Sequence, residues 1–298
     1  MRIVILGGTG SIGTLVTQRL VSDGHHVTGV VRNETSERRL KHLGAHPHRG
    51  DIRTASSWSR LLDRADAVVH LAATFDDRMA EADRSVAEAI CAHTSQQDRR
   101  LRVLYTGGCW LYGETGDRVA TERTPLRPIA PFAFMARHAA QLQAAANLSV
   151  ATVHPALAYH KAPNHAQGAF HRFVKDAQTT NPIEVWGSVK TRWPLVEADD
   201  LAAAYVALVT RPDLTGAFNV AAQQGVPVQN ILRHISESFD HDGSFLIRDA
   251  AYVLRNFGPM GQGPMLDQQM DAQKITAATG WQPKLRDFRD AFNLHQLA

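Results

Sequence analysis

The chain begins with MRIVILGGTGSIG, residues 1–13, and this stretch decides the fold. Residues 2–6 are rich in β-branched side chains, as is typical of a central parallel strand that is covered on both faces. Glycines at positions 7, 10 and 13 follow at once, and an amphipathic helix is predicted over residues 11–22. This order of strand, glycine turn and helix is typical of a site that holds the diphosphate of a dinucleotide on the amides at a helix N-terminus.

Strands and helices continue to alternate beyond this turn. Short connections between such elements specify a parallel sheet that is wound by right-handed crossovers. The chain is therefore predicted to be α/β, with a Rossmann-type doubly wound parallel sheet. The strands are expected at residues 26–31, 67–71, 102–106 and 149–154 and just before Gly50, and the helices at 84–96 and 136–146.

The alternation loosens after residue 156, where segments with proline and glycine become frequent. A helix is predicted at 198–210, opened by Asp199 and Asp200, and a Gly-Trp-Gln-Pro turn follows at 280–283. We expect residues 1–155 to form the dinucleotide-binding domain. Residues 156–298 are expected to form mainly a smaller, interleaved lobe for the substrate, with residues 191–222 returning to the Rossmann core.

The composition is that of an ordinary globular protein. With 44% hydrophobic residues, a chain of 298 residues can bury a large core. The net charge is +3, and the basic residues are scattered rather than gathered in a stripe with aromatic side chains. This pattern argues against a nucleic-acid partner. A small-molecule substrate is the expected partner, and a homodimer remains open.

The cysteines and histidines exclude several kinds of site. Cys91 and Cys109 are the two cysteines and form no Cys-x-x-Cys pair, so neither a disulfide framework nor a cysteine zinc site is indicated. None of the fifteen histidines has a tight metal-ligand spacing with carboxylate or cysteine partners, and no metal is predicted. The first apolar run breaks at Gly7, and no apolar segment is long enough to cross a membrane. We expect a cytoplasmic protein that does not bind a membrane.

The residue after the second predicted strand bears on the choice of cofactor. An acidic residue at this position would grip a ribose 2′-hydroxyl, but the sequence has Arg32 there. A guanidinium can accept a 2′-phosphate, with Arg38 or Arg39 as helpers. These two arginines also fit a solvated helix face. NADP(H) is therefore the expected cofactor, and NAD is the alternative.

The residues expected to contact this cofactor lie in the glycine turn and at the ends of the predicted strands. Small residues after the fourth strand leave room for an adenosine. The full set is Gly7, Thr9, Gly10, Ser11, Ile12, Gly13, Arg32, Asp51, Ile52, Leu71, Ala72, Ala73, Thr106, Arg137 and Pro155.

Several motifs together resemble an extended short-chain dehydrogenase/reductase of the NAD-dependent epimerase/dehydratase family. They are GGTGSIG at 7–13, VVHLAA at 68–73, LYTGGCWLYG at 104–113, HPALAY at 154–159, WPLVEADDLAAAYV at 193–206 and KITAATGWQP at 274–283. The resemblance covers nearly the whole chain. It implies a Rossmann domain, a smaller C-terminal substrate lobe and an active site between them.

The chain departs from this family at its catalytic residues, and it resembles an atypical member. The family uses a tyrosine and a lysine four residues apart on one helix, where the cation lowers the pKa of the phenol and holds the nicotinamide ribose. One register over residues 131–141 places Ala133 and Arg137 at these positions, and a shift by one places Phe134 and His138 there. Neither contains a tyrosine, and Gly108 stands where the family has a strand serine.

Three residues are therefore candidates for the chemistry. Arg137 stays charged, so it can hold a ribose or a substrate carboxylate but is a poor proton shuttle. Tyr112 could donate a proton, although a residue at this place commonly shapes the substrate pocket, and His138 has a side chain suited to proton transfer. Tyr159 and His154 are more remote alternatives.

Two functions fit these features. The first is an NADP(H)-dependent oxidoreductase, epimerase or dehydratase that acts on a small polar or carbonyl-bearing metabolite with a non-standard acid/base set. The second is a non-catalytic NADP(H)-binding redox sensor or regulatory protein. The loss of the tyrosine, lysine and serine together favours the second, whereas the complete C-terminal lobe favours the first, to which we lean.

Overall fold

A computed structural model describes residues 1–94, 100–161, 168–179 and 181–292 of the chain. Its centre is a seven-stranded sheet in the order β11-β7-β5-β4-β1-β2-β3, in which every pair of neighbours is parallel. The α/β class and the doubly wound sheet predicted from the sequence are thereby confirmed. The strands are β1 (Arg2–Leu6), β2 (His26–Val31), β3 (His46–Arg49), β4 (Ala67–His70), β5 (Leu101–Thr106), β7 (Leu148–Pro155) and β11 (Gly216–Val220).

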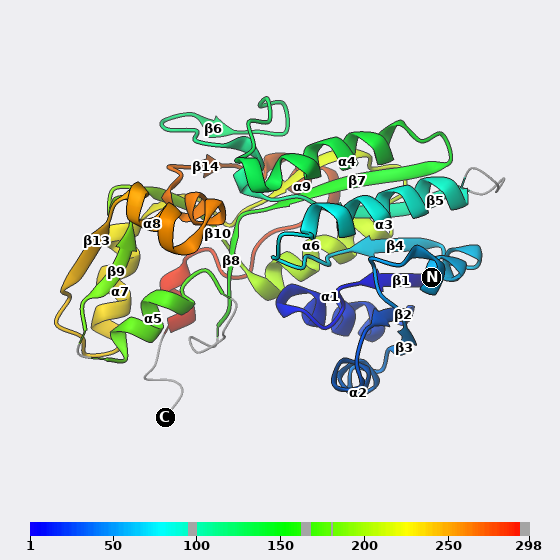
Figure 1. The fold of residues 1–298 in the computed structure, drawn as a ribbon, viewed down its shortest axis with the longest axis horizontal. Helices are drawn as coiled ribbons and strands as arrows, with labels where there is room; N and C mark the ends of the chain where they lie inside the picture. The colour runs from blue at the N-terminus through cyan, green and yellow to red at the C-terminus, as the bar shows by residue number, and fades with distance from the viewer. Residues whose placement is uncertain (95–99, 162–167, 180, 293–298) are drawn as a thin grey trace.

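Helices cover both faces of this sheet (Figure 1). Successive residues of β1 point to opposite faces: Ile3 and Ile5 pack in the core on the side of α1 and α6, and Val4 and Leu6 pack on the side of α3 and α4. Burial of apolar residues on both faces explains why the strands are almost continuously hydrophobic. The helices are α1 (Ser11–Ser22), α2 (Glu34–His42), α3 (Met79–Thr94), α4 (Ala133–Ala144) and α6 (Ala198–Val209).

The strand order reverses between β1 and β4. The chain runs outward from β1 through β2 to β3, and then returns to the other side of β1 to form β4 and β5. In an open parallel sheet, such a switch point leaves a crevice outside the carboxyl ends of the two strands, where ligands commonly bind. Leu6 and His70 end these two strands and pair with each other in the register of the sheet.

One helix starts earlier than predicted, and another starts at the predicted residue, Ala198, but is capped by a residue that was not predicted. Helix α3 begins at Met79, several residues before the predicted start, while residues 95 and 96 of the prediction lie outside the described residues. Helix α6 is capped by Glu197, whose carboxylate accepts hydrogen bonds from the backbone nitrogens of Asp199 (2.8 Å) and Asp200 (3.1 Å). Asp199 and Asp200 thus lie in the first turn, where their charges favour the positive end of the helix dipole.

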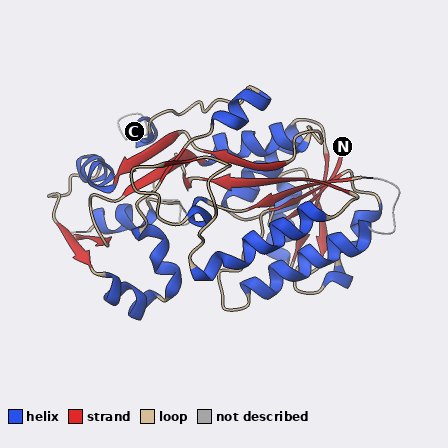
Figure 2. Cartoon of the chain, turned by 90° about the horizontal axis from the view of Figure 1, so that it is seen from above, coloured by secondary structure: helices blue, strands red, loops and turns tan. Residues whose placement is uncertain are grey.

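A second group, of small sheets and helices, lies beside the large sheet, next to the end of β7 from which the chain continues into β8 (Figures 1 and 2). It contains a three-stranded sheet in the order β12-β10-β8 and two-stranded pairs of β13 with β9 and of β14 with β6. None of the described helices is long and apolar enough to cross a membrane. The remaining elements are β6 (Val119–Ala120), β8 (Leu157–Tyr159), β9 (Ile183–Trp186), β10 (Arg192–Glu197), β12 (Gln223–Pro227), β13 (Phe245–Arg248), β14 (Gln269–Met270), α5 (His171–Ala177), α7 (Val228–Ser238), α8 (Ala250–Phe257) and α9 (Gln273–Thr279).

The segment 191–222 is shared between the two groups. Helix α6 packs against α1, and β11 pairs with β7 in the large sheet. Strand β10, in contrast, pairs with β8 and β12 in the small sheet. The chain therefore returns to the large sheet after β10.

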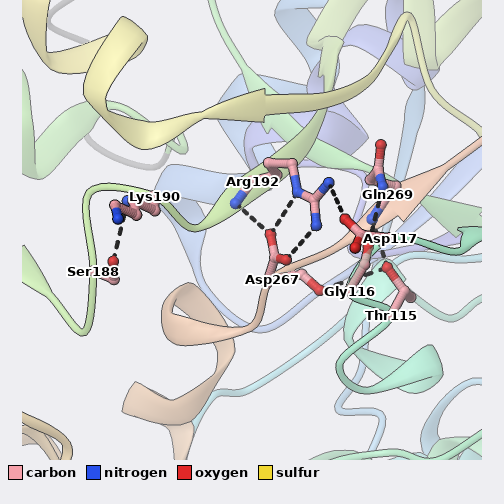
Figure 3. Close-up of polar contacts among 8 residues, drawn as sticks. All are labelled: Thr115, Gly116, Asp117, Ser188, Lys190, Arg192, Asp267 and Gln269. Atoms are coloured by element: carbon pink, nitrogen blue, oxygen red, sulfur yellow. Dashed lines mark hydrogen bonds and ion pairs between the residues drawn. The ribbon is translucent and has the colours of Figure 1, made fainter.

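An arginine on β10 ties three segments of the chain together (Figure 3). The side chain of Arg192 donates to both carboxylate oxygens of Asp267, at 2.9 Å and 2.5 Å, and to Oδ1 of Asp117 at 3.0 Å. Beside it, the backbone nitrogen of Gln269 donates to Oγ1 of Thr115 at 2.8 Å. These contacts fasten the loop around residues 115–117 to the small sheet, and this loop directly follows the segment Cys109–Tyr112.

Candidate functional site

The glycine turn after β1 is packed so tightly that two of its positions exclude a side chain. Gly7 has φ +87°, and a Cβ there would lie 2.7 Å from the backbone nitrogen of Ala72. A Cβ on Gly13 would lie 2.0 Å from the carbonyl oxygen of Gly7. The first turn of α1 is therefore held directly against the ends of β1 and β4.

Gly10 has a different environment. It is the N-cap of α1 and makes no side-chain cap, so the amides of the first helical turn remain available to an anion. A Cβ at Gly10 would meet only the carbonyl oxygen of Gly7, at 3.4 Å. The space in front of Gly10 is open on the side of the cavity that it lines.

A cavity of about 480 Å³ lies at the switch point of the large sheet. The glycine turn and the residues after β4, β5 and β7 form its polar and backbone walls. Trp110, Leu111, Phe132 and Met135 form an apolar wall. One cavity thus joins the expected diphosphate site to a space large enough for a second ring system.

Ten of the residues predicted to contact a cofactor line this cavity. They are Gly7, Gly10, Ser11, Ile12, Gly13, Leu71, Ala72, Ala73, Thr106 and Pro155. The other five do not line it: Thr9, Arg32, Asp51, Ile52 and Arg137.

Arg32 follows β2 directly, and its side chain is exposed. Its proposed helper Arg38 is held by Glu34 through an ion pair of 3.1 Å on the exposed surface of α2, and Arg39 is exposed too. Asp51, after β3, accepts a hydrogen bond from the backbone nitrogen of Arg53 at 2.9 Å. Of these three arginines, Arg32 is the one that lies at the end of β2, as predicted.

Tyr112 is buried, and its hydroxyl lies away from the cavity lining. The hydroxyl donates a hydrogen bond of 2.6 Å to Oδ1 of Asn219 on β11, and burial raises the pKa of the phenol well above its usual range. The charge of Glu122 raises the pKa of this phenol further. In this arrangement Tyr112 links the segment Cys109–Tyr112 to strand β11 of the large sheet.

The two registers considered for α4 correspond to two different faces of the helix. Phe134 and His138 are buried and point into the protein, while Arg137 is exposed and does not line the cavity. Met135, one residue after Phe134, lines the cavity. The register with Phe134 and His138 therefore describes the face of α4 that points into the protein. The role of Arg137 as a ribose clamp stays a prediction, and it requires a different position of the Arg137 side chain.

A buried carboxylate with three hydrogen-bond donors lies next to the cavity, and it was not among the predicted residues. Asp83 on α3 is contacted by Nε2 of His70 (2.9 Å), Nδ1 of His138 (2.5 Å) and the hydroxyl of Tyr105 (2.7 Å). His70 and Asp83 both line the cavity. The sequence gave a partial signal for this cluster, because His70 lies in the motif at 68–73. It gave no signal for Asp83, because a buried aspartate in a polar helical segment cannot be told from an exposed one by sequence.

The remaining candidates have structural surroundings. Burial lowers the pKa of His154 to about 4, so its ring is neutral, and its Nδ1 accepts a hydrogen bond from the backbone nitrogen of Gly108 at 3.3 Å. Tyr159 is buried in the small lobe and stacks on Phe170. Burial raises the pKa of the Cys109 thiol to about 12, which makes it unreactive near neutral pH.

The fold recurs in known proteins. UDP-glucose 4-epimerase of Lactobacillus helveticus is 23% identical in a match that covers 97% of this chain and 94% of that protein. The structure of Thermus thermophilus UDP-glucose 4-epimerase in complex with NAD has a TM-score of 0.78 at 20% identity, covering 99% of this chain and 97% of that one. The DesIV double mutant, a dTDP-glucose 4,6-dehydratase from Streptomyces venezuelae with NAD and DAU bound, has a TM-score of 0.81 at 18% identity, covering 98% of this chain and 94% of that one.

The sequence model of one family spans most of the described site. It matches residues 3–221, from β1 through the glycine turn and the cavity walls to the end of β11. The resemblance seen in the sequence motifs is thereby confirmed. The chain belongs to the NAD dependent epimerase/dehydratase family.

Proposed function

We propose that the chain is an NADP(H)-dependent oxidoreductase of the epimerase/dehydratase type that acts on a small polar or carbonyl-bearing metabolite. The observation that carries this proposal is the single cavity that joins the glycine turn at Gly10 to the apolar wall at Trp110 and Phe132. A dinucleotide and a small substrate both need space at the switch point of the sheet. When bound, a nicotinamide cofactor supplies a carrier for hydride.

The residues of the turn fit a diphosphate. Gly7 and Gly13 hold α1 close to the strands, and Gly10 leaves open the space into which a phosphate would fit. The uncapped N-terminus of α1 offers backbone donors and the positive end of the helix dipole. Ala72 and Ala73, after β4, are small and leave room for the nucleoside.

Arg32 supports the preference for the phosphorylated cofactor. Its guanidinium is exposed at the end of β2, and the neighbouring acidic side chains Glu34 and Glu37 are engaged by Arg38 and by Lys41. A charge-assisted hydrogen bond to a 2′-phosphate contributes about 1.5–3 kcal/mol, or roughly a 10- to 150-fold difference in affinity. NADPH is therefore expected to bind more tightly than NADH, although the two structural relatives described above contain NAD.

Calorimetric titration with NADPH and NADH tests this function. The wild type is expected to prefer NADPH, and Arg32→Ala is expected to lose the preference while keeping its affinity for NADH. Arg84→Ala is the matched control, because its side chain is exposed and paired with Glu88 within α3. Equal affinities in the wild type would contradict the NADP(H) preference, and failure of both cofactors to bind would contradict the proposed function.

A further inference from the structure

The wall of the cavity beyond the glycine turn consists of apolar side chains. Trp110 and Phe132 are the largest of them, and their ring centroids lie 5.4 Å apart with the planes tilted by 50°. Leu111 and Met135 line the same part of the cavity and pack in one cluster with these rings. This wall therefore offers a ligand aromatic and aliphatic surface.

A close backbone contact fixes the orientation of Trp110. A Cβ on Gly263 would lie 2.5 Å from Cε2 of Trp110, so the segment Pro259–Met265 packs directly against the indole. Nε1 of Trp110 is buried and has no hydrogen-bond partner among the described residues. Because this N–H has no accessible surface, the indole presents carbon to the cavity and no hydrogen-bond donor.

The charges around the cavity do not suit an anionic substrate. Among the residues that the structure describes, none that lines the cavity is a lysine or an arginine. Asp83 does line it. Burial by itself would raise the pKa of Asp83, but the hydrogen bonds from His138 and His70 hold that pKa well below its usual range, so the carboxylate is an anion at neutral pH. An anionic group bound against this wall would lose its hydration without gaining a cation as partner.

Two arginines of the small lobe are engaged away from the cavity. Arg248 donates to Glu184 at 2.8 Å, and its guanidinium lies 4.3 Å from the ring centroid of Tyr252. The guanidinium of Arg172 lies 3.7 Å from the ring centroid of Trp186. Neither arginine lines the cavity. A diphosphate on the substrate, which proteins commonly hold with such cations, finds none in this wall.

An exposed aromatic ring lies at the rim of the cavity. Phe75 lines the cavity although it is 66% exposed, and its φ of +50° is rare and strained for a bulky residue. The neighbouring Asp76 holds the loop, because its carboxylate accepts a hydrogen bond from Oγ1 of Thr74 at 2.7 Å and pairs with Arg53 at 2.7 Å. The ring of Phe75 is thus kept where a ligand in the cavity can cover it.

We propose that the substrate carries an uncharged apolar group of about the size of a phenyl ring, which binds against Trp110 and Phe132 and is covered by Phe75. This inference rests on the proposed function and narrows it to carbonyl compounds that carry such a group. Binding removes the apolar surfaces of the group, the wall and Phe75 from water together, and aromatic rings add favourable offset or edge-to-face contacts.

Saturation-transfer difference NMR on the full-length protein loaded with NADPH tests the substrate class. The probe is 2-phenylethanol, which joins a phenyl ring to the hydroxyl that a reduced carbonyl would leave. Since cofactor and probe are both reduced, no hydride is transferred during the measurement. UDP-glucose is the comparison, because two relatives are UDP-glucose 4-epimerases.

We expect 2-phenylethanol to give a difference signal that is strongest at its ring protons, and UDP-glucose at the same concentration to give none. Binding of UDP-glucose, or no signal from 2-phenylethanol with a protein that binds NADPH, would overturn the inference. Failure of the wild type to bind NADPH would instead contradict the proposed function.

Two variants of the cavity locate the bound ring. Phe75→Ala is expected to raise the Kd of 2-phenylethanol by about 5-fold, as for the loss of one aromatic contact, with the affinity for NADPH retained. Met135→Gln replaces an apolar side chain by a polar one of similar length and is expected to raise the Kd as well. Phe245→Ala is the matched control, because it removes a ring that is 48% exposed on β13 and does not line the cavity.

The control should have the Kd of the wild type. An unchanged Kd in either cavity variant, or an equal rise in Phe245→Ala, would overturn the inference. A loss of NADPH affinity in Phe75→Ala would place this ring on the cofactor and overturn its assignment to the substrate.

Discussion

The hydroxyl of Tyr112 donates a hydrogen bond of 2.6 Å to Oδ1 of Asn219, across the core between the cavity wall and strand β11. Asn219 is fully buried, and its Nδ2 donates to the carbonyl oxygen of Ala120 at 3.4 Å. The phenol is therefore a member of a buried hydrogen-bonded pair. Its chemistry is directed away from the cavity that the neighbouring Leu111 and Trp110 line.

Tyr112→Phe is expected to destabilise the protein while leaving the affinity for NADPH unchanged. Removal of the hydroxyl leaves Oδ1 of Asn219 buried without its donor, which costs about 1–3 kcal/mol. Urea unfolding measures the stability, and fluorescence titration with NADPH measures the affinity. If Tyr112 were the proton donor, the variant would instead lose turnover at unchanged stability.

The elements that place the cavity could be predicted because their signals are local. The strand at residues 2–6, the glycine spacing after it and the apolar strand at 67–71 each show in a few neighbouring residues. Parallel order and right-handed crossovers then bring the strand ends together with little freedom. Ten of the predicted cofactor residues consequently lie around one cavity.

The chemistry could not be predicted in the same way, because it depends on which face of a helix turns inward. Arg137 and His138 are neighbours in sequence, but packing against α3 buries His138 and leaves Arg137 exposed. Asp83 lies among polar residues near the start of α3 and acquires its three donors only through the tertiary fold. Its helix also begins earlier than predicted, which made its position on the helix impossible to fix from the sequence.

Arg102 of β5 is expected to contribute strongly to stability. Its guanidinium is buried and donates to the carbonyl oxygens of Leu208 (2.7 Å) and Leu214 (2.8 Å), which fastens the end of α6 to the sheet. Arg102→Ala leaves these acceptors without donors and should lower the free energy of unfolding by about 3 kcal/mol. Arg100→Ala is the matched control, because that arginine is exposed and, among the described residues, donates to one carbonyl, that of Leu148. Similar losses in the two variants would contradict this role.

His154 should make the stability depend on pH. Burial lowers its pKa to about 4 in the folded protein, whereas the pKa of an unfolded histidine is about 6.5. Between these values the unfolded chain binds more protons, so the contribution of His154 is complete above pH 6.5 and is lost as the pH falls toward 4.

The slope from this one group is at most about 1.4 kcal/mol per pH unit. Between pH 6.5 and pH 5, the free energy of unfolding of His154→Gln should therefore fall by up to about 2 kcal/mol less than that of the wild type. Urea unfolding at the two pH values measures this difference. Parallel stability curves for the two proteins would mean that folding does not lower the pKa of His154.

Binding of NADPH by Gly10→Val tests the central claim, that a dinucleotide lies with its diphosphate at the glycine turn. The backbone of Gly10 has φ −70° and ψ 178°, and a Cβ there would approach only the carbonyl oxygen of Gly7, at 3.4 Å, so valine is expected to leave the fold intact. Its side chain would fill the space in front of the helix N-terminus. We predict that calorimetry detects NADPH binding to the wild type and none to Gly10→Val, while thermal unfolding of the two proteins remains similar. Wild-type affinity in a folded Gly10→Val protein would contradict the account.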